Sequence, residues 1–341
     1  MSTPPPLRVA VIGCGDIAHL HLDVIGNLPD AVLVAVADSD PAACRSTAER
    51  FSVPGYTDYT QMLDAELLDV VHLCTPHDLH VEMAIACLDR GINVLTEKPV
   101  ATTIADAQRL IEAAGRASAQ VGVCFQNRYN PTSRAMDEAL RSQRFGRVLG
   151  AVASVTWFRD RAYYLAKPWR GRRETAGGGV LINQAIHTLD LLQWFLGDAV
   201  DVRGCASTLL LSDTIEVEDN AHLVLTHPTG ARSVFYATNN SVDNAPVTIE
   251  VRTESAVLRL DGDLSAVQPD GRREILASDG RPAGERAYWG DSHGRLIADF
   301  NRHVRTGEHF WIDPAEATKT LAIIRSVYEQ STTADRWPAT R

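Results

Sequence analysis

Residues Leu7–Ala18 read LRVAVIGCGDIA and carry the clearest structural signal of the chain. An apolar run ends in Gly13, Gly15 and Ala18, which gives the spacing G-x-G-x-x-A. The first glycine permits a tight turn, the second lets the backbone approach a pyrophosphate, and the small third residue lets a helix pack closely. Between a strand and a helix, this spacing predicts a dinucleotide-binding turn with the helix N-terminus at the phosphates. The alternative is that the glycines serve only the turn.

The next segments of the chain alternate in the same way. Strands are predicted at Leu7–Gly13, Ala31–Asp38, Val70–Thr75, Asn93–Thr96 and Val121–Gln126, and helices at about 16–27, 41–51, 78–90 and 103–117. The strands are continuous apolar runs, which is typical of parallel strands covered by helices on both faces. Residues 1–126 are therefore predicted to form an α/β Rossmann domain with a doubly wound parallel sheet.

The pattern changes after Asn130-Pro131, and residues 127–341 are predicted to form an α+β domain for substrate binding and oligomerisation. Helices are expected at about 131–143, 180–196, 293–305 and 314–330, and strands at 148–158, Val202–Leu211, Ala221–Thr226, Ser233–Thr238 and Val247–Leu260. Short turns between the strands indicate a large, mostly antiparallel open sheet. The outer face of such a sheet is more often a subunit interface than a solvated surface, which predicts a homo-oligomer. The final helix is expected to pack back on the first domain.

Composition excludes several classes of function. The formal charge of the 341 residues is −10 and no Lys/Arg-rich block occurs, which argues against nucleic acid as a partner. No apolar run approaches the roughly 20 residues that cross a membrane, and no export signal is seen. The six cysteines have no C-x-x-C spacing, which argues against a disulfide framework and a zinc site and fits a reducing, cytoplasmic location.

Asp38 ends the second predicted strand, where a carboxylate accepts hydrogen bonds from a ribose 2′-hydroxyl. Because a carboxylate repels a 2′-phosphate, NAD is favoured over NADP. Arg45 lies nearby in the sequence and leaves NADP open.

Two later strands end in Cys74-Thr75-Pro76-His77, with His80 close behind, and in Thr96-Glu97-Lys98-Pro99. Ligands of open α/β sheets lie outside the carboxyl ends of the strands. There the Lys98 ammonium would hydrogen-bond a substrate oxygen and stabilise the charge that develops on it. The alternative is a solvated surface lysine.

The predicted helix 180–196 contains no Lys or Arg, yet Asn183, His187, Asp190 and Trp194 share one stripe at 100° per residue. His187 suits a general base that takes a hydroxyl proton, with Asp190 orienting it or capping the stripe. The alternative is a hydrogen-bonded core histidine.

The segment Arg159–Glu174 carries six basic and two acidic side chains, interleaved with Tyr163, Tyr164 and Trp169. Cationic and aromatic groups together suit a sugar face or a phosphate, so both neutral and anionic substrates are candidates. A solvated loop or a subunit contact explains the segment equally well.

These motifs together resemble the glucose–fructose oxidoreductase / inositol dehydrogenase (Gfo/Idh/MocA) family. The residues that carry the resemblance, besides the turn at Gly13, are Thr75-Pro76, Glu97-Lys98-Pro99, Gln126–Pro131, Trp169-Arg170-Gly171, the run Gly177–Gly179 with Asn183, Gln184, His187 and Asp190, His293, and Asp313–Gln330. Many members of this family have Asp where this chain has Asn183, and an amide cannot accept a proton.

The resemblance implies an NAD(P)-dependent oxidoreductase that interconverts a secondary alcohol and a ketone on a sugar, inositol or nucleotide-sugar. It also implies a homodimer or homotetramer formed through the C-terminal sheet. The implied cofactor residues are Gly13, Gly15, Asp16, Ile17, Ala18, Asp38, Thr75, Pro76, His77, His80, Glu97, Lys98 and Gln126. The implied substrate residues are Lys98, Arg128, Tyr164, Trp169, Arg170, Asn183, His187 and His293, with Lys98 and His187 catalytic. The histidines show no metal pattern, and hydride transfer to NAD needs no metal.

Two other functions are consistent with the same residues. One is an NAD-requiring glycosidase or lyase in which transient oxidation activates the ring. The other is a non-catalytic sensor that retains nucleotide binding.

Overall fold

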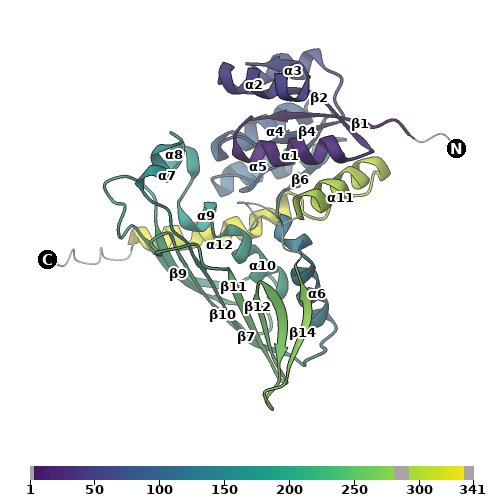
Figure 1. The fold of residues 1–341 in the computed structure, drawn as a ribbon. Coiled ribbons are helices and arrows are strands. Elements are labelled where there is room, and N and C mark those ends of the chain that lie inside the picture. Colours follow the sequence, from purple (N-terminus) through teal and green to yellow (C-terminus); the bar gives the residue numbers. More distant parts are fainter. Residues whose placement is uncertain (1–3, 280–291, 334–341) are drawn as a thin grey trace. The chain divides into compact units, whose positions relative to one another are not determined.

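A computed structural model describes residues 4–279 and 292–333, which form two compact units (Figure 1). The first unit comprises Met1–Gln126 and Asp291–Thr318, and the second comprises Asn127–Gly290 and Lys319–Arg341. The part that joins the first unit from the end of the chain is therefore 291–318, which contains a whole helix and the beginning of the last one.

The first unit is built on a six-stranded parallel sheet of the order β3-β2-β1-β4-β5-β6. Its strands are β1 (Leu7–Ile12), β2 (Ala31–Ala37), β3 (Gly55–Tyr56), β4 (Val70–Leu73), β5 (Asn93–Thr96) and β6 (Val121–Val123). The predicted Rossmann sheet is confirmed. β3 was not predicted because two residues are too few to show a periodic pattern.

The helices between these strands are α1 (Asp16–Asn27), α2 (Pro41–Phe51), α3 (Tyr59–Ala65), α4 (His80–Leu88) and α5 (Ile104–Arg116), with a 3-10 turn at His77–Leu79. Side-chain caps define several starts. The Asp40 carboxylate accepts the backbone N–H groups of Ala42 and Ala43 before α2, and Thr103 accepts the N–H of Asp106 before α5.

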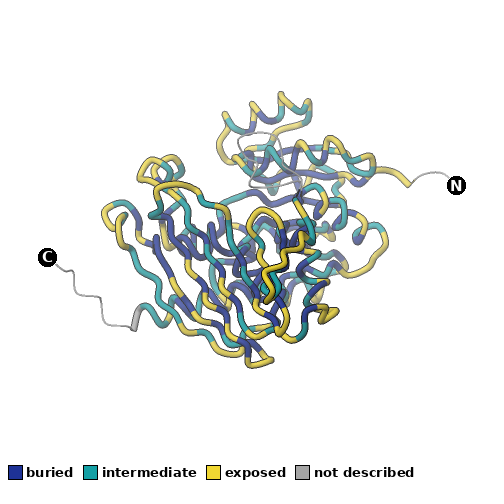
Figure 2. The backbone as a smooth tube through the Cα atoms, turned by 60° about the horizontal axis from the view of Figure 1, so that its bottom comes forward, coloured by how far each residue is buried: buried dark blue, intermediate teal, exposed yellow. Residues whose placement is uncertain are grey.

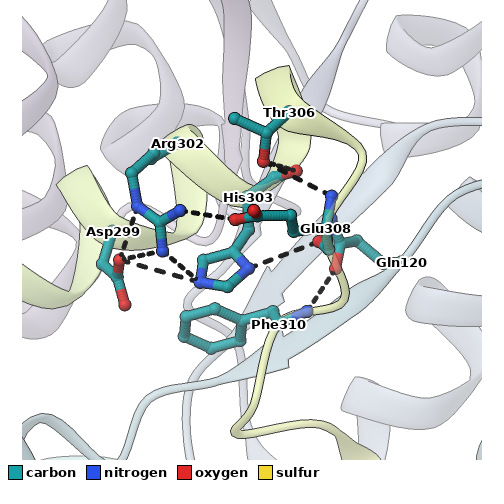
Figure 3. A network of polar contacts seen from close by, with 7 residues as sticks. All are labelled: Gln120, Asp299, Arg302, His303, Thr306, Glu308 and Phe310. Atoms are coloured by element: carbon teal, nitrogen blue, oxygen red, sulfur yellow. Dashed lines mark hydrogen bonds and ion pairs between the residues drawn. The ribbon is translucent and has the colours of Figure 1, made fainter.

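Helix α11 (Ser292–Thr306) lies beside α1 in this unit (Figure 1). The segment that follows it is hydrogen-bonded to the strand edge at β6 (Figure 3). The Gln120 side chain accepts the Phe310 N–H at 2.8 Å and donates to the Glu308 carbonyl at 3.2 Å. Phe300 and Phe310 pack directly on Gly122, where any Cβ would lie within 3 Å of both rings. The segment from α11 to Phe310 is therefore part of the first unit.

The second unit contains an eight-stranded sheet of the order β14-β13-β12-β11-β7-β10-β9-β8, in which only β7 and β10 pair in parallel. Its strands are β7 (Val148–Thr156), β8 (Asp201–Ser207), β9 (Asn220–Thr226), β10 (Arg232–Thr238), β11 (Thr248–Thr253), β12 (Val257–Asp261), β13 (Asp263–Val267) and β14 (Arg273–Ser278). The predicted mostly antiparallel sheet is confirmed.

Two predicted strands end differently. β8 stops at Ser207 instead of Leu211, because the Asp219 carboxylate accepts the N–H groups of residues 209, 210 and 211 and takes them out of the ladder. The predicted strand Val247–Leu260 is a hairpin of β11 and β12, since the Thr253 N–H bonds to the Ala256 carbonyl and closes a turn.

The helices of the second unit are α6 (Pro131–Arg141), α7 (Arg161–Leu165), α8 (Arg173–Ala176), α9 (Val180–Asn183), α10 (Ile186–Leu196) and most of α12 (Pro314–Thr333), with a 3-10 turn at Gln126–Tyr129. The prediction of one helix over 180–196 is wrong. At Ala185 the N–H reaches back five residues to the Val180 carbonyl, at 2.8 Å, so the helical register slips between α9 and α10.

One face of the large sheet packs under α6, α9 and α10. Exposed and buried residues alternate along its strands (Figure 2). The opposite face exposes Val152, Val224, Val234 and Tyr236, while Leu223 and Phe235 are buried beneath the helices. None of the helices in the described residues is long and apolar enough to cross a membrane.

Candidate active site

The turn after β1 has the geometry that a dinucleotide phosphate needs. Gly13 has φ +93°, and a Cβ there would lie 2.5 Å from the Cys74 carbonyl oxygen. A Cβ at Gly15 would meet nothing within 4 Å, so the space over this residue is open. Helix α1 begins at Asp16 without a side-chain cap, and Ala18 is fully buried where the helix packs. Backbone N–H groups at such a helix start bind phosphate.

Asp38 follows β2 and is tied to the same turn. One carboxylate oxygen accepts the Cys14 N–H at 2.7 Å, and the other accepts the Asp40 N–H at 2.8 Å. Each oxygen keeps acceptor capacity, and the half-buried side chain suits the hydroxyls of a ribose. The residues at this end of the sheet therefore fit NAD.

The segments after β4 and β5 are joined by His80, which is fully buried. Its Nδ1 lies 2.8 Å from the Pro99 carbonyl and its Nε2 lies 3.0 Å from the Thr75 carbonyl. Burial lowers the pKa of His80, and a neutral imidazole has one N–H, so it donates to one of these carbonyls at a time. His80 thus holds the loop of Thr75 against the loop of Lys98.

Lys98 lies at the end of β5 with its side chain half-buried, which is the strand-end location that the sequence predicts. Its backbone N–H lies 3.3 Å from a Glu97 carboxylate oxygen. Burial lowers the pKa of the Lys98 ammonium, and the negative charge of Glu97 opposes that shift.

Glu97 itself points into the first unit. Its Oε1 lies 3.1 Å from His21 Nε2 and 3.5 Å from His293 Nε2, and His21 Nδ1 lies 2.9 Å from His72 Nδ1. All four side chains are buried. We call His21, His72, Glu97 and His293 the buried histidine cluster. The resemblance implies a substrate contact for His293 and a cofactor contact for Glu97. It assigns no role to His21 or His72.

Two members of this cluster, His21 and Glu97, lie near Cys124. Among the described residues, these three come nearest to a metal-ligand geometry, since their donor atoms lie within 4.8 Å of one another. His21 and Glu97 already hydrogen-bond each other there. We therefore assign these atoms to a hydrogen-bonded cluster, and a reaction without metal stays a prediction.

In the second unit, the glycine run Gly177–Gly179 leads into α9. Gly177 adopts φ +74°, a Cβ at Gly178 would overlap the Tyr328 hydroxyl, and a Cβ at Gly179 would overlap the Glu218 carbonyl oxygen. The buried Glu218 carboxylate accepts the Gly179 N–H at 2.8 Å, the Leu181 N–H at 3.0 Å and the Tyr328 O–H at 2.7 Å. Burial raises the pKa of Glu218. Gly178 and Gly179 are needed because the Tyr328 hydroxyl and the Glu218 backbone carbonyl leave no room for a Cβ.

Asn183 on α9 and His187 on α10 are half-buried, while most residues around them are buried. They are therefore among the few side chains of this helix pair that solvent reaches. Asp190, by contrast, is completely buried. Its two carboxylate oxygens accept hydrogen bonds from the Arg128 guanidinium at 2.8 and 2.7 Å. Asp190 and Arg128 therefore form a buried ion pair. Arg128 has no exposed surface, and its contact with substrate stays a prediction.

The basic segment 159–174 is less charged than its sequence indicates. Arg161 pairs with Asp213 at 2.8 Å and Arg172 with Glu216 at 2.6 Å, and both acids lie outside the segment. Tyr164 is buried against Ile215 and Val217, which favours a structural role. Trp169 and Arg170 are half-buried, and the Arg170 guanidinium lies 4.3 Å from the centre of the Tyr163 ring.

Comparison with known proteins agrees with this fold and geometry. The family described as "Oxidoreductase family, NAD-binding Rossmann fold" matches residues 7–125, and the "GFO/IDH/MocA C-terminal domain" matches residues 133–259. The D-apiose dehydrogenase of Paraburkholderia graminis is 29% identical, over 96% of this chain and 88% of that one. The myo-inositol 2-dehydrogenase of Thermotoga maritima is 25% identical, over 89% of each.

A solved structure extends the similarity over nearly the full length. The WlbA dehydrogenase of Chromobacterium violaceum, in complex with NADH and UDP-GlcNAcA, has a TM-score of 0.84 and 30% identity, and the match covers 97% of each chain. The two family models and the full-length match all indicate the same family. The chain belongs to the Gfo/Idh/MocA family of NAD-binding oxidoreductases.

Proposed function

We propose that this protein is an NAD-dependent dehydrogenase that interconverts a secondary alcohol and a ketone on a sugar, an inositol or a nucleotide-linked sugar. The observation that carries the proposal is the location of Lys98 just after β5. The open turn at Gly15 and the oriented carboxylate of Asp38 follow β1 and β2, so all three lie at the carboxyl ends of strands of one parallel sheet. The dehydrogenases among its relatives support the type of reaction.

The proposed chemistry assigns one task to each side chain. Gly13, Gly15 and Asp38 would hold NAD, which when bound would supply the acceptor for the hydride of the carbinol carbon. His187 accepts the proton of the same carbinol's hydroxyl group, so that a ketone remains. The Lys98 ammonium donates a hydrogen bond to the carbinol oxygen and stabilises its developing negative charge. In the reverse direction His187 returns the proton.

Asn183, beside His187, is proposed to hold a neighbouring hydroxyl. Its amide donates and accepts hydrogen bonds but takes no proton in the reaction. Trp169 and Arg170 are proposed to contact the substrate at its periphery. Because WlbA is known in complex with a nucleotide-sugar acid, such anionic sugars belong in the substrate panel.

NAD is proposed as the preferred coenzyme, because Asp38 would face the 2′-position of the ribose. A second copy of the chain is proposed to cover the sheet face that exposes Val152, Val234 and Tyr236, giving a homodimer or homotetramer. The proposed location is the cytoplasm.

The experiment that tests the proposal follows absorbance at the reduced-nicotinamide band over sugars, inositols and nucleotide-sugars with either coenzyme. We expect turnover with at least one class, and a loss of about 10²–10⁴-fold in kcat for K98M and for H187A with NAD affinity retained. The matched control is K319M, since Lys319 forms an exposed ion pair with Asp198. Wild-type kinetics in both K98M and H187A would refute the assignment.

A further inference from the structure

The break between α9 and α10 contains a buried glutamine, Gln184, with 6% of its surface exposed. Among the described residues, no side chain caps the start of α10, and the amide of Gln184 supplies directional contacts there. Its Nε2 donates to the Tyr163 hydroxyl at 3.1 Å, and its Oε1 accepts from Asn239 Nδ2 at 3.2 Å. Both ends of the amide are therefore used, one toward α7 and one toward the end of β10.

Asn239 fixes this network to the large sheet. It follows β10, and its side chain is completely buried. Its Nδ2 also donates to the Tyr164 hydroxyl at 2.8 Å. Its backbone N–H donates to the Asp219 carbonyl at 2.8 Å, and its own carbonyl accepts the Arg159 N–H at 2.9 Å. Because backbone and side chain are both hydrogen-bonded, Asn239 is a firm anchor for Gln184.

Two neighbouring tyrosines of α7 receive these bonds. Their rings meet edge to face, with the ring centres 5.1 Å apart. Tyr164 packs on Ile215, whereas Tyr163 is half-buried. The Arg170 guanidinium lies 4.3 Å from the centre of the Tyr163 ring and donates to the Tyr163 backbone carbonyl at 3.2 Å. The bond from Gln184 to Tyr163 therefore joins the helix break to the part of the chain that carries Arg170.

A buried network of amides and hydroxyls specifies position more strictly than apolar packing. Polar groups lose water on burial and regain hydrogen bonds only over a narrow range of distances and angles. The break carries Asn183 and His187. The basic segment carries Trp169 and Arg170, and all four side chains are half-buried. Groups that act on one substrate have to be held to within about 0.5 Å, which hydrogen bonds behind them achieve.

We propose that Gln184 is a positioning residue that, anchored by Asn239, holds α7 in register with the helix break. It thereby sets the distance of Trp169 and Arg170 from His187. This role rests on the proposed function, in which those three residues contact the substrate. Gln184 itself acts through them and does not touch the reacting atoms.

The first experiment needs no substrate. Native full-length protein is digested with trypsin, and mass spectrometry of the peptides gives the rate of cleavage after the arginines of the segment 159–174. Q184M keeps the length of the side chain without its hydrogen bonds. We expect cleavage in this segment to be about five-fold faster, because loss of the bond to Tyr163 favours local opening by that factor.

Two controls accompany the digestion. T248V removes another hydrogen bond of the second unit, between Thr248 and Ser154 at 2.8 Å, and should leave the rate in the segment at the wild-type value. Cleavage elsewhere in the chain should not rise in Q184M, since a general loss of stability would accelerate it at every site. Acceleration confined to the segment therefore reports the local contact.

The second experiment measures KM and kcat separately, with the substrate identified by the absorbance panel. In Q184M we expect kcat/KM to fall by about 10²-fold, through a higher KM for that substrate as well as a lower kcat. The KM for NAD should not change. A smaller fraction of folded enzyme would lower kcat alone and leave both KM values at the wild-type level, so the rise in KM distinguishes positioning from a merely structural role.

A double variant tests whether the effect runs through one bond. Y163F removes the hydroxyl that accepts from Gln184 and keeps the ring. If the two residues act through their hydrogen bond, kcat/KM of Q184M/Y163F should match that of the more affected single variant within about two-fold. Effects that multiply in the double variant would refute action through this bond.

The outcomes separate this inference from the proposed function. Faster cleavage in Q184M, with a wild type that oxidises no substrate of the panel, supports the hold on α7 and refutes the reaction. Cleavage at the wild-type rate in Q184M overturns the inference whatever the activity, and so do unchanged kinetics in a variant whose segment opens faster. If Q184M does not fold, Y163F tests the same hydrogen bond from its half-buried side, with the same expected results.

Discussion

The ion pair of Arg128 and Asp190 allows a sharp test of how the second unit is stabilised. Each side chain is 1% exposed, and two hydrogen bonds of 2.8 and 2.7 Å join them. In R128M, Asp190 would remain buried with a hydrogen bond from Thr320 at 3.2 Å but without its counter-charge. Removal of one partner of such a pair costs about 3–5 kcal/mol. R128M is expected to lose that amount of unfolding free energy.

The assay is urea unfolding followed by tryptophan fluorescence, with two matched variants. The double variant R128M/D190L removes both charges, and it should be more stable than R128M by about 2 kcal/mol or more, since an apolar pair is tolerated in such sites. R161M breaks the exposed pair with Asp213, whose side chains are 60% and 70% exposed, and should cost less than about 1 kcal/mol. If R128M is no less stable than R161M, or if the double variant is less stable than R128M, the buried pair does not stabilise the second unit in this way.

Three further predictions concern the glycine run, the buried histidines and the coenzyme. G179A should lose about 3 kcal/mol or more of unfolding free energy, because its Cβ would overlap the Glu218 carbonyl oxygen. The control G115A, in α5, has open space for its Cβ and should leave the stability unchanged or raise it. Equal stabilities of the two variants in urea would contradict this. Burial lowers the pKa of His72, His80 and His293, so below the unfolded value of about 6.5 the unfolded chain binds protons that the folded chain does not. Stability is therefore present above that pH and lost on acidification, and calorimetry should show a lower Tm at pH 5 than at pH 7.5; a Tm that does not fall would contradict this. D38A should weaken NAD binding more than NADP binding in calorimetric titrations, and an unchanged ratio of the two Kd values would show that Asp38 does not set coenzyme preference.

The parts of the fold that the sequence predicts correctly are those with local causes. Gly13 needs its positive φ because the chain turns there within a few residues. The parallel strands are predicted by their continuous apolar runs. The strand-end location of Lys98 follows from the same local pattern.

The parts that the sequence does not predict depend on partners far along the chain. The break between α9 and α10 accompanies a helix start held by Glu218, which lies 39 residues after Gly179. Nothing near His21 indicates that its ring bonds Glu97, 76 residues away. Helical spacing suggests His187 as the partner of Asp190, but it gives no sign of the buried ion pair with Arg128, 62 residues earlier. Periodicity gives the face of a residue and not the partner that it meets there.

In the proposed reaction, the amine of Lys98, which follows β5, and the imidazole of His187 on α10 both contact the oxygen of the carbinol that is oxidised. A crystal structure of the protein with NADH and the substrate identified by the absorbance panel measures this directly. We expect Lys98 Nζ and a ring nitrogen of His187 both to lie about 3 Å from the oxygen on the reacting carbon. Either nitrogen beyond the reach of one bridging water from that oxygen would contradict it.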